Sequence, residues 1–225
     1  MNKKVIIIGA IILCFVILVM YVFFSLYGSP IGKAKFCKEC RNYLTEMYNE
    51  KMTIVDVVYS FKTQDYFANI SVDNTDITFH VVKDGVKLSD NYFIEYWKHE
   101  TSNDITEVVT TVYGKNKGTG SLYFTQGSPI SNRDNKIENK VPSFLSVRNK
   151  FNTSIFGFVN ISAEFDSANC LSEYEQIYKV IKYVFEKYSP KNIVLEFSDD
   201  AKFKIEIEDF KQLKNKTDIQ NYKQQ

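Results

Sequence analysis

The chain of 225 residues is almost electrically neutral and rich in aromatic residues. Its 28 Lys and Arg nearly balance 27 Asp and Glu, so it lacks the basic excess that supplies most of the affinity for nucleic acids. The 15 Tyr and 18 Phe, with only 4 Pro and 9 Gly, indicate packed β-structure rather than disorder. The composition therefore excludes general nucleic-acid binding and predicts one or two folded domains.

An uncharged, apolar run at residues 5–27 predicts a transmembrane helix. At a rise of about 1.5 Å per residue, this run spans a hydrocarbon core of about 30 Å. The alternatives are a buried core helix and a cleaved signal peptide. The run is long for the first, and no clear small-x-small cleavage site supports the second. Cys14 lies inside the run and is interpreted as a small hydrophobic residue. We expect residues 5–27 to contact membrane lipid.

The charges beside the apolar run are nearly balanced across it. Lys3 and Lys4 precede the run, and four basic residues follow it between positions 33 and 41. The positive-inside rule alone therefore does not fix the orientation. Because a tail of four residues remains in the cytoplasm easily, we expect residues 1–4 to be cytoplasmic. The protein is then a single-pass protein of the cell membrane, with its soluble part extracytoplasmic.

Residues 30–100 predict a first small α+β domain. Pro30 follows Gly28 and Ser29 and can open an amphipathic helix. Apolar and polar residues then alternate in three stretches, residues 55–61, 66–72 and 77–81, which predict strands. Turn residues separate or follow these strands at Gln64-Asp65, Asp73-Asn74 and Asp84-Gly85. We expect the helix to cover one face of an antiparallel sheet of three or four strands.

Polar side chains occupy the alternate positions of these three strands. They are Asp56, Asn69, Ser71, Thr78 and His80. Such alternation is typical of an antiparallel sheet with one face open to solvent. His80 is therefore expected to point away from the packed face, and we interpret it as a surface residue rather than a catalytic one.

The junction between the two predicted domains carries signals for both helix and strand. Ser89 and Asp90 are expected to cap a helix that carries Trp97 and is interrupted near residues 102–104. Residues 105–113 are rich in Val and Thr, so helix and strand compete there. The capping pattern Asp104-x-x-Glu107 favours a helix, which the glycines of 114–120 then end.

Residues 101–225 predict a second α+β domain. The expected elements are a strand at 121–124, a long loop at 126–140, a short helix at 142–151, a strand at 154–165, a helix from 172 to 188, a hairpin at 193–207 and a frayed helix from 211. The long helix is expected to begin at a capping box, Ser172-x-x-Glu175. The predicted fold class is α+β: an N-terminal transmembrane helix followed by two small domains, each with a helix packed on an antiparallel sheet.

This arrangement resembles the YfjL-like proteins of Gram-positive bacteria. The similarity rests on Gly28-Ser29-Pro30-Ile31-Gly32-Lys33, Val58-Tyr59-Ser60-Phe61-Lys62, Tyr66-Phe67-Ala68, Ile177-Tyr178-Lys179-Val180-Ile181-Lys182-Tyr183 and Glu208-Asp209-Phe210. It extends over essentially the whole chain, although each motif is structural. The resemblance implies a membrane-tethered protein with two small α+β domains, and it implies no catalytic residues.

Two of the four cysteines, Cys37 and Cys40, form a CxxC. Three interpretations are open: two small residues on the apolar face of a helix, a local disulfide, or a redox or metal site. A metal site needs further ligands, and the chain holds only two histidines, His80 and His99.

No strong catalytic motif occurs in the sequence. Asp73-x-x-Asp76 and Asp199-Asp200 are interpreted as turn residues rather than metal ligands. The glycines Gly114, Gly118 and Gly120 lack the strand and helix that flank a phosphate loop. Five aromatic residues fit either a glycan or peptide groove or ordinary packing: Tyr59, Tyr66, Tyr92, Tyr96 and Trp97. We predict no catalytic, cofactor-binding or metal-ligating residues, and no cofactor.

The leading functional prediction is a non-catalytic binding or interaction module of the cell envelope. Sheet faces and edges are natural binding surfaces, and the expected partner is an envelope protein, a peptide or a wall component. The alternative is a membrane-tethered thiol–disulfide oxidoreductase that uses Cys37 and Cys40. A depressed thiol pKa would distinguish the alternative from the leading prediction. A pilin-like assembly is a third hypothesis, which the helix break at Gly28 disfavours.

Overall fold

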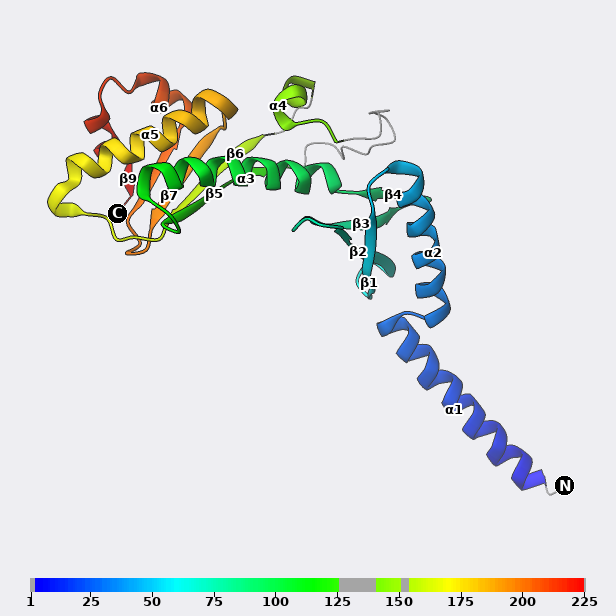
Figure 1. The fold of residues 1–225 in the computed structure, drawn as a ribbon. Helices are drawn as coiled ribbons and strands as arrows, with labels where there is room; N and C mark the ends of the chain where they lie inside the picture. Colours follow the sequence, from blue (N-terminus) through cyan, green and yellow to red (C-terminus); the bar gives the residue numbers. More distant parts are fainter. Residues whose placement is uncertain (1–2, 126–140, 151–153, 225) are drawn as a thin grey trace. The chain divides into compact units, whose positions relative to one another are not determined.

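A computed structural model describes residues 3–125, 141–150 and 154–224. They form two compact units, the first ending at Tyr92 and the second beginning at Phe93. Each unit combines helices with one sheet, which confirms the α+β fold class (Figure 1). The loop predicted at residues 126–140 lies outside the described residues.

The first unit begins with two helices that are separated by a short break. Its elements are α1 (Lys3–Tyr27), α2 (Pro30–Met47), β1 (Met52–Ser60), β2 (Asp65–Val72), β3 (Thr78–Asp84) and β4 (Lys87–Asp90). From Ile7 to Tyr27, α1 is mostly apolar and is exposed apart from the half-buried Phe24, and it is the one described helix long and apolar enough to cross a membrane. Its 25 residues correspond to about 37 Å at 1.5 Å per residue.

The break between α1 and α2 is fixed by a tyrosine from the sheet. Gly28 takes a left-handed φ of +71° and ends α1, and the Ser29 side chain caps α2 by accepting from the Gly32 amide at 2.9 Å. The Tyr66 hydroxyl on β2 accepts from the Ser29 amide at 2.7 Å and donates to the Ser29 carbonyl at 3.0 Å. One phenol therefore satisfies both backbone groups of the residue at the break.

The first sheet is an antiparallel meander in the order β1-β2-β3-β4. Apolar residues of α2 and of one sheet face form the core, including Phe36, Leu44, Ile70, Phe79 and Val81. Positive φ angles at Gln64, Asn74 and Gly85 confirm the three predicted turns. Ser89 and Asp90 lie in β4, so the predicted helix cap is wrong for Ser89. Asp90 does accept from the Tyr92 amide, at 2.8 Å, where α3 begins.

The second unit is built on a mixed sheet of five strands. Its elements are α3 (Tyr92–Tyr113, from Phe93 onward), β5 (Gly118–Phe124), α4 (Phe144–Val147), the 3₁₀ turn Arg148–Lys150, β6 (Ile155–Ile161), the 3₁₀ turn Ser167–Asn169, α5 (Cys170–Tyr188), β7 (Asn192–Phe197), β8 (Lys202–Glu206), α6 (Ile207–Gln212), the 3₁₀ helix Lys216–Tyr222 and β9 (Lys223–Gln224). The predicted hairpin is confirmed as β7–β8. The strand order is β5-β6-β7-β8-β9, and β6 pairs with β7 in parallel because α5 connects them.

Three local predictions for the second unit are wrong. The helix α3 runs without interruption through residues 102–104. The helix α5 begins at Cys170 instead of at Ser172, because the Asp166 side chain caps the preceding 3₁₀ turn by accepting from the amides of Ala168 and Asn169. The predicted frayed tail is ordered: Ile219 is fully buried and β9 pairs with β8.

Candidate functional site

A row of three hydrogen-bonded polar side chains crosses the open face of the first sheet. Asp56, Asn69 and His80 lie on β1, β2 and β3 and are paired across the strands. The Asn69 amide nitrogen donates to Asp56 Oδ1 at 2.5 Å, and His80 Nδ1 lies 2.7 Å from Asn69 Oδ1. Asp56 and His80 are exposed, so the row faces solvent as predicted for this sheet face.

The row fixes which nitrogen of His80 carries the proton. The Asn69 oxygen can only accept, so His80 Nδ1 must donate to it. In the neutral imidazole Nε2 then holds the free lone pair, and no described residue bonds to it. The His80 amide also donates to the Asn91 side-chain oxygen at 2.7 Å, which ties the strand to the start of α3. The open face thus presents an oriented hydrogen-bond acceptor.

Two further rows flank the polar row on the same face. The strand register aligns an apolar row on one side, Val58, Phe67 and Val82, and a hydroxyl row on the other, Thr53, Ser71 and Thr78. The Phe67 ring meets the His80 ring edge to face at 6.2 Å. We call these three rows the open-face platform. It offers apolar contact beside hydrogen-bonding groups, the usual composition of a binding surface.

The two cysteines of the CxxC lie in the middle of α2. Cys40 is fully buried and Cys37 is half-buried, and both are free thiols. Burial, together with the neighbouring Cys37 and Glu39, raises the pKa of Cys40 to about 12. The helix N-terminus, which lowers the pKa of reactive thiols, is several residues away at Pro30. The oxidoreductase alternative stays a prediction, and Cys37 is the sulfur that solvent can reach.

The glycines and paired carboxylates take structural positions. Gly114 ends α3 with a φ of +99°, whereas Gly118 and Gly120 lie in β5 against α3. Asp73 accepts from Thr53 and pairs with Lys51, and Asp199 accepts from the Phe165 amide. Among the described residues, no three His, Cys, Asp or Glu side chains gather as metal ligands would.

The aromatic residues considered for a groove do not line one together. Tyr92 and Trp97 are buried, and the Trp97 indole donates to the Pro142 carbonyl at 2.8 Å. Tyr59 packs against Tyr66 beside the break between α1 and α2, with ring centres 5.0 Å apart. Packing accounts for the positions of these four side chains.

A second polar cluster joins α3 to α5 in the second unit. Asp104 accepts from the hydroxyls of Tyr183 and Tyr188, the latter at 2.6 Å, and from the Lys187 ammonium at 2.7 Å. Desolvation opposes the charge of Asp104, but the bonds from Lys187 and the two tyrosines outweigh it and lower the pKa of this carboxyl. Each of its donors comes from α5, so we interpret the cluster as a clamp between helices.

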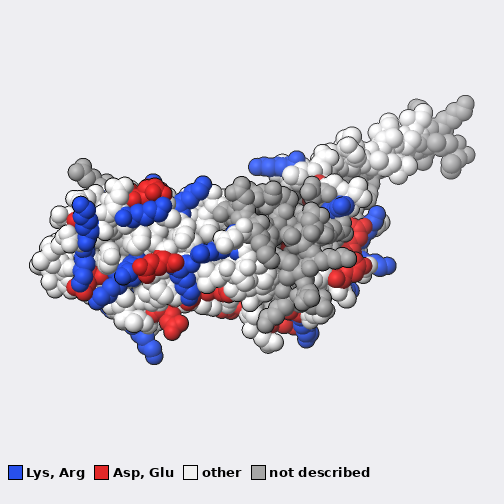
Figure 2. Space-filling view, turned by 90° about the horizontal axis from the view of Figure 1, so that it is seen from above, with Lys and Arg blue, Asp and Glu red and all other residues white. Residues whose placement is uncertain are grey.

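Charges on the surface of the second unit are mixed in sign. Basic and acidic side chains lie beside one another on the face shown in Figure 2. Lys216 and Glu175 are one pair of opposite charges in the second unit, with their side chains 2.7 Å apart. The described part of this face has no continuous basic patch.

These features define an α+β protein whose N-terminal helix is long and apolar enough to cross a membrane. Residues 1–92 match the family model of the YfjL-like N-terminal domain. This match confirms the resemblance over residues 1–92. No curated protein and no solved structure matches the chain. Over the remaining residues the YfjL-like resemblance stays a prediction.

Proposed function

We propose that this protein is a membrane-anchored, extracytoplasmic binding module of the cell envelope. Residues 5–27 are the anchor, residues 1–4 are cytoplasmic, and the two units lie outside the membrane. The exposed apolar surface of α1 supports the anchor, because water would otherwise meet a row of large side chains such as Ile11, Phe15 and Leu18. An interaction with lipid removes that cost.

The open-face platform is the observation that carries the binding function. An exposed histidine whose tautomer is fixed by Asn69 and Asp56 accepts a hydrogen bond in one direction only. The adjacent apolar row adds contact area, since Val82 is 40% exposed. A partner for this surface presents an N–H or O–H donor next to an apolar group. A protein, a peptide and a wall component all meet this requirement.

Photo-crosslinking in intact cells tests the binding surface. A benzoylphenylalanine at Val82 should form a specific adduct with an envelope component. The same group at Val86, which is 96% exposed in the neighbouring turn, serves as the control. In the Val82 background, His80→Ala should lower the adduct yield by roughly 2–10-fold, because one hydrogen bond contributes about 0.5–1.5 kcal/mol. Equal adducts at the two positions, or no effect of His80→Ala, would exclude the platform as the binding surface.

Labelling of an engineered cysteine tests the orientation. Ser167 is exposed in the second unit, whereas the native Cys170 is half-buried. In intact cells, Ser167→Cys should react with a membrane-impermeant maleimide, and the parent protein provides the background. Protection of Ser167→Cys until the cells are lysed would place the units in the cytoplasm and overturn the proposed topology.

A further inference from the structure

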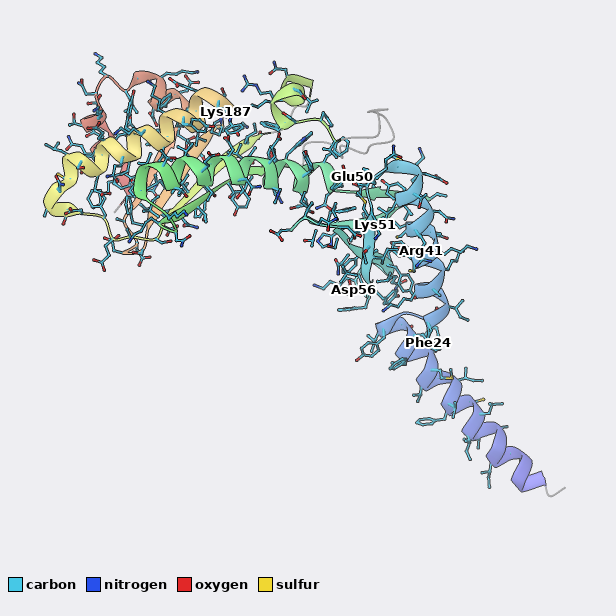
Figure 3. The ribbon with its side chains drawn as sticks, viewed as in Figure 1. Phe24, Arg41, Glu50, Lys51, Asp56 and Lys187 are labelled. Atoms are coloured by element: carbon cyan, nitrogen blue, oxygen red, sulfur yellow. The ribbon has the colours of Figure 1, made fainter. Side chains whose placement is uncertain are left out.

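A groove runs between α2 and the outermost strand of the first sheet. Its volume is about 440 Å³, and its walls come from α2, from the connection after it and from the start of β1. Figure 3 labels three of its charged residues, Arg41, Glu50 and Lys51. Leu44 of α2 and Met52 and Ile54 of β1 provide its apolar lining. The groove shares Thr53 with the open-face platform, and its other lining residues lie outside the platform.

The strand that borders the groove has unpaired backbone groups. β1 pairs with β2 alone, so it is an edge strand of the described sheet. The Asp73 amide donates to the Lys51 carbonyl at 3.0 Å, which makes 51 and 73 a hydrogen-bonded pair. Antiparallel pairs alternate, so the backbone groups of Met52 and Ile54 point away from β2. Both residues line the groove.

Two features limit what can pair with this edge. The register shifts between Ile54 and Asp56, so a bulge at Val55 interrupts the edge just after the groove. The usable edge is therefore short, from Met52 to Ile54. The helix α2 forms the opposite wall of the groove, so a strand added to this edge would lie between β1 and α2. A short extended peptide fits this space, whereas a long strand of a second sheet does not.

The charges of the groove select for an acidic group. Arg41 is exposed and has no acidic partner among the described residues. Lys51 pairs with Asp73 at 3.4 Å, and Glu50 accepts from the Tyr92 hydroxyl, so both of these charges are already engaged. Arg41 lines the same groove as the unpaired backbone groups of Met52 and Ile54, and its guanidinium can pair with a carboxylate bound there.

From this geometry we propose that the groove binds a short extended segment of a partner protein. The segment adds to the edge of β1 at Met52 and Ile54, and an aspartate or glutamate side chain in it pairs with Arg41. The outward amides and carbonyls supply backbone bonds, and the apolar lining receives the alternate side chains. The proposal goes beyond the binding function proposed for the open face, and it does not depend on which side of the membrane the unit occupies.

Selection from a random library of displayed octapeptides tests the proposal. The full chain in lipid nanodiscs is the target, with empty nanodiscs for counter-selection. Enriched peptides should contain an acidic residue between β-branched or apolar residues. A synthetic copy of the leading peptide should lose about tenfold in affinity when its acid is replaced by the amide. Against Arg41→Gln, the acidic and amide peptides should bind equally.

Removal of backbone donors tests the strand addition. Met52→Pro deletes one outward N–H at the first residue of β1, where proline is tolerated, and Met52→Ala keeps that N–H as the control. Met52→Pro should weaken the leading peptide several-fold more than Met52→Ala does. If Met52→Pro does not fold, N-methylation of alternate amides along one edge of the peptide makes the same comparison on the unaltered protein.

Three outcomes would overturn the proposal. The first is the absence of enriched peptides. The second is the same affinity for the acidic and amide peptides on the unaltered chain. The third is binding that is unchanged whichever edge of the peptide is N-methylated. Cross-linking of Thr53→Cys between two copies in peptide-free nanodiscs would show that a second chain occupies the groove instead.

Discussion

Gly120→Ala should destabilise the second unit by about 1–3 kcal/mol, the usual cost of overpacking a core. A Cβ built on Gly120 would lie 2.1 Å from Cγ2 of Ile105, a fully buried residue of α3. Alanine lowers the conformational entropy of the unfolded chain, which stabilises the fold and offsets part of this loss. The 2.1 Å separation between the new Cβ and Ile105 is too short for that gain to outweigh the clash. Chemical denaturation of the full chain in detergent should show the loss as a lower midpoint.

A second substitution identifies the clash as the cause. Ile105→Leu moves the branch from Cβ to Cγ and removes the methyl that meets the new Cβ. The double variant should therefore recover part of the stability lost in Gly120→Ala, which gives a favourable coupling in a double-mutant cycle. Ser121→Ala on the other face of β5 should change stability by less than about 0.5 kcal/mol. Strict additivity of Gly120→Ala and Ile105→Leu would contradict the proposed contact.

Ile181→Ala should cost about 2–5 kcal/mol, the largest effect we expect from a single substitution. Ile181 is 1% exposed at the centre of the apolar stripe of α5, and Leu195 and Ile205 of the hairpin are equally buried. Truncation removes buried apolar surface and leaves a cavity. Since a typical domain is stable by about 5–15 kcal/mol, the denaturant midpoint should fall clearly.

The neighbouring residue provides a matched control for Ile181→Ala. Lys182 lies on the outer face of α5, where its ammonium is 3.8 Å from Glu186. An exposed pair of this kind contributes little, so Lys182→Ala should cost less than about 0.5 kcal/mol. Equal midpoints for the two variants would show that the buried stripe of α5 does not stabilise the unit.

The sequence predicted most of the elements because their apolar patterns are regular. Alternation in β1, β2, β3, β7 and β8 follows from sheets that bury one face each, so both faces can be assigned before the strands are aligned. The apolar stripe of α5 recurs at helical spacing and is equally easy to identify in the sequence. The break at Gly28 and the stop at Ser189 follow from local backbone preferences, and Ser189 has a left-handed φ of 51°.

Long-range partners decided what the sequence could not predict. Glu175 was expected to complete a capping box, but its carboxylate pairs with Lys179 and with the distant Lys216. The parallel pairing of β6 with β7 depends on where α5 packs. Gly118 and Gly120 interrupt the β-pattern in the sequence. Both are needed in the fold because α3 packs so closely on β5 that a Cβ at either position would clash with a side chain of α3.

The candidate site illustrates the same limit for strand register. The alternating pattern placed Asp56, Asn69 and His80 on one face. The positions of the turns limited which residues of neighbouring strands could lie opposite one another. The bulge at Val55 shifts β1 by one residue and brings Asp56 opposite Asn69. A one-residue change in register moves a side chain to the other face, so the hydrogen-bonded row follows from the folded sheet alone. The edge groove beside α2 likewise needs the packed helix.

The hydroxyl of Tyr66 gives the break between α1 and α2 a mechanical property. A glycine hinge usually lets two helices swing independently, but here both backbone groups of Ser29 are bonded to one side chain of β2. The connection between α1 and α2 is therefore stiffer than a free glycine hinge. If residues 5–27 are the proposed membrane anchor, we expect a change in bilayer thickness that tilts α1 to act on β2 through Tyr66 instead of being absorbed at Gly28.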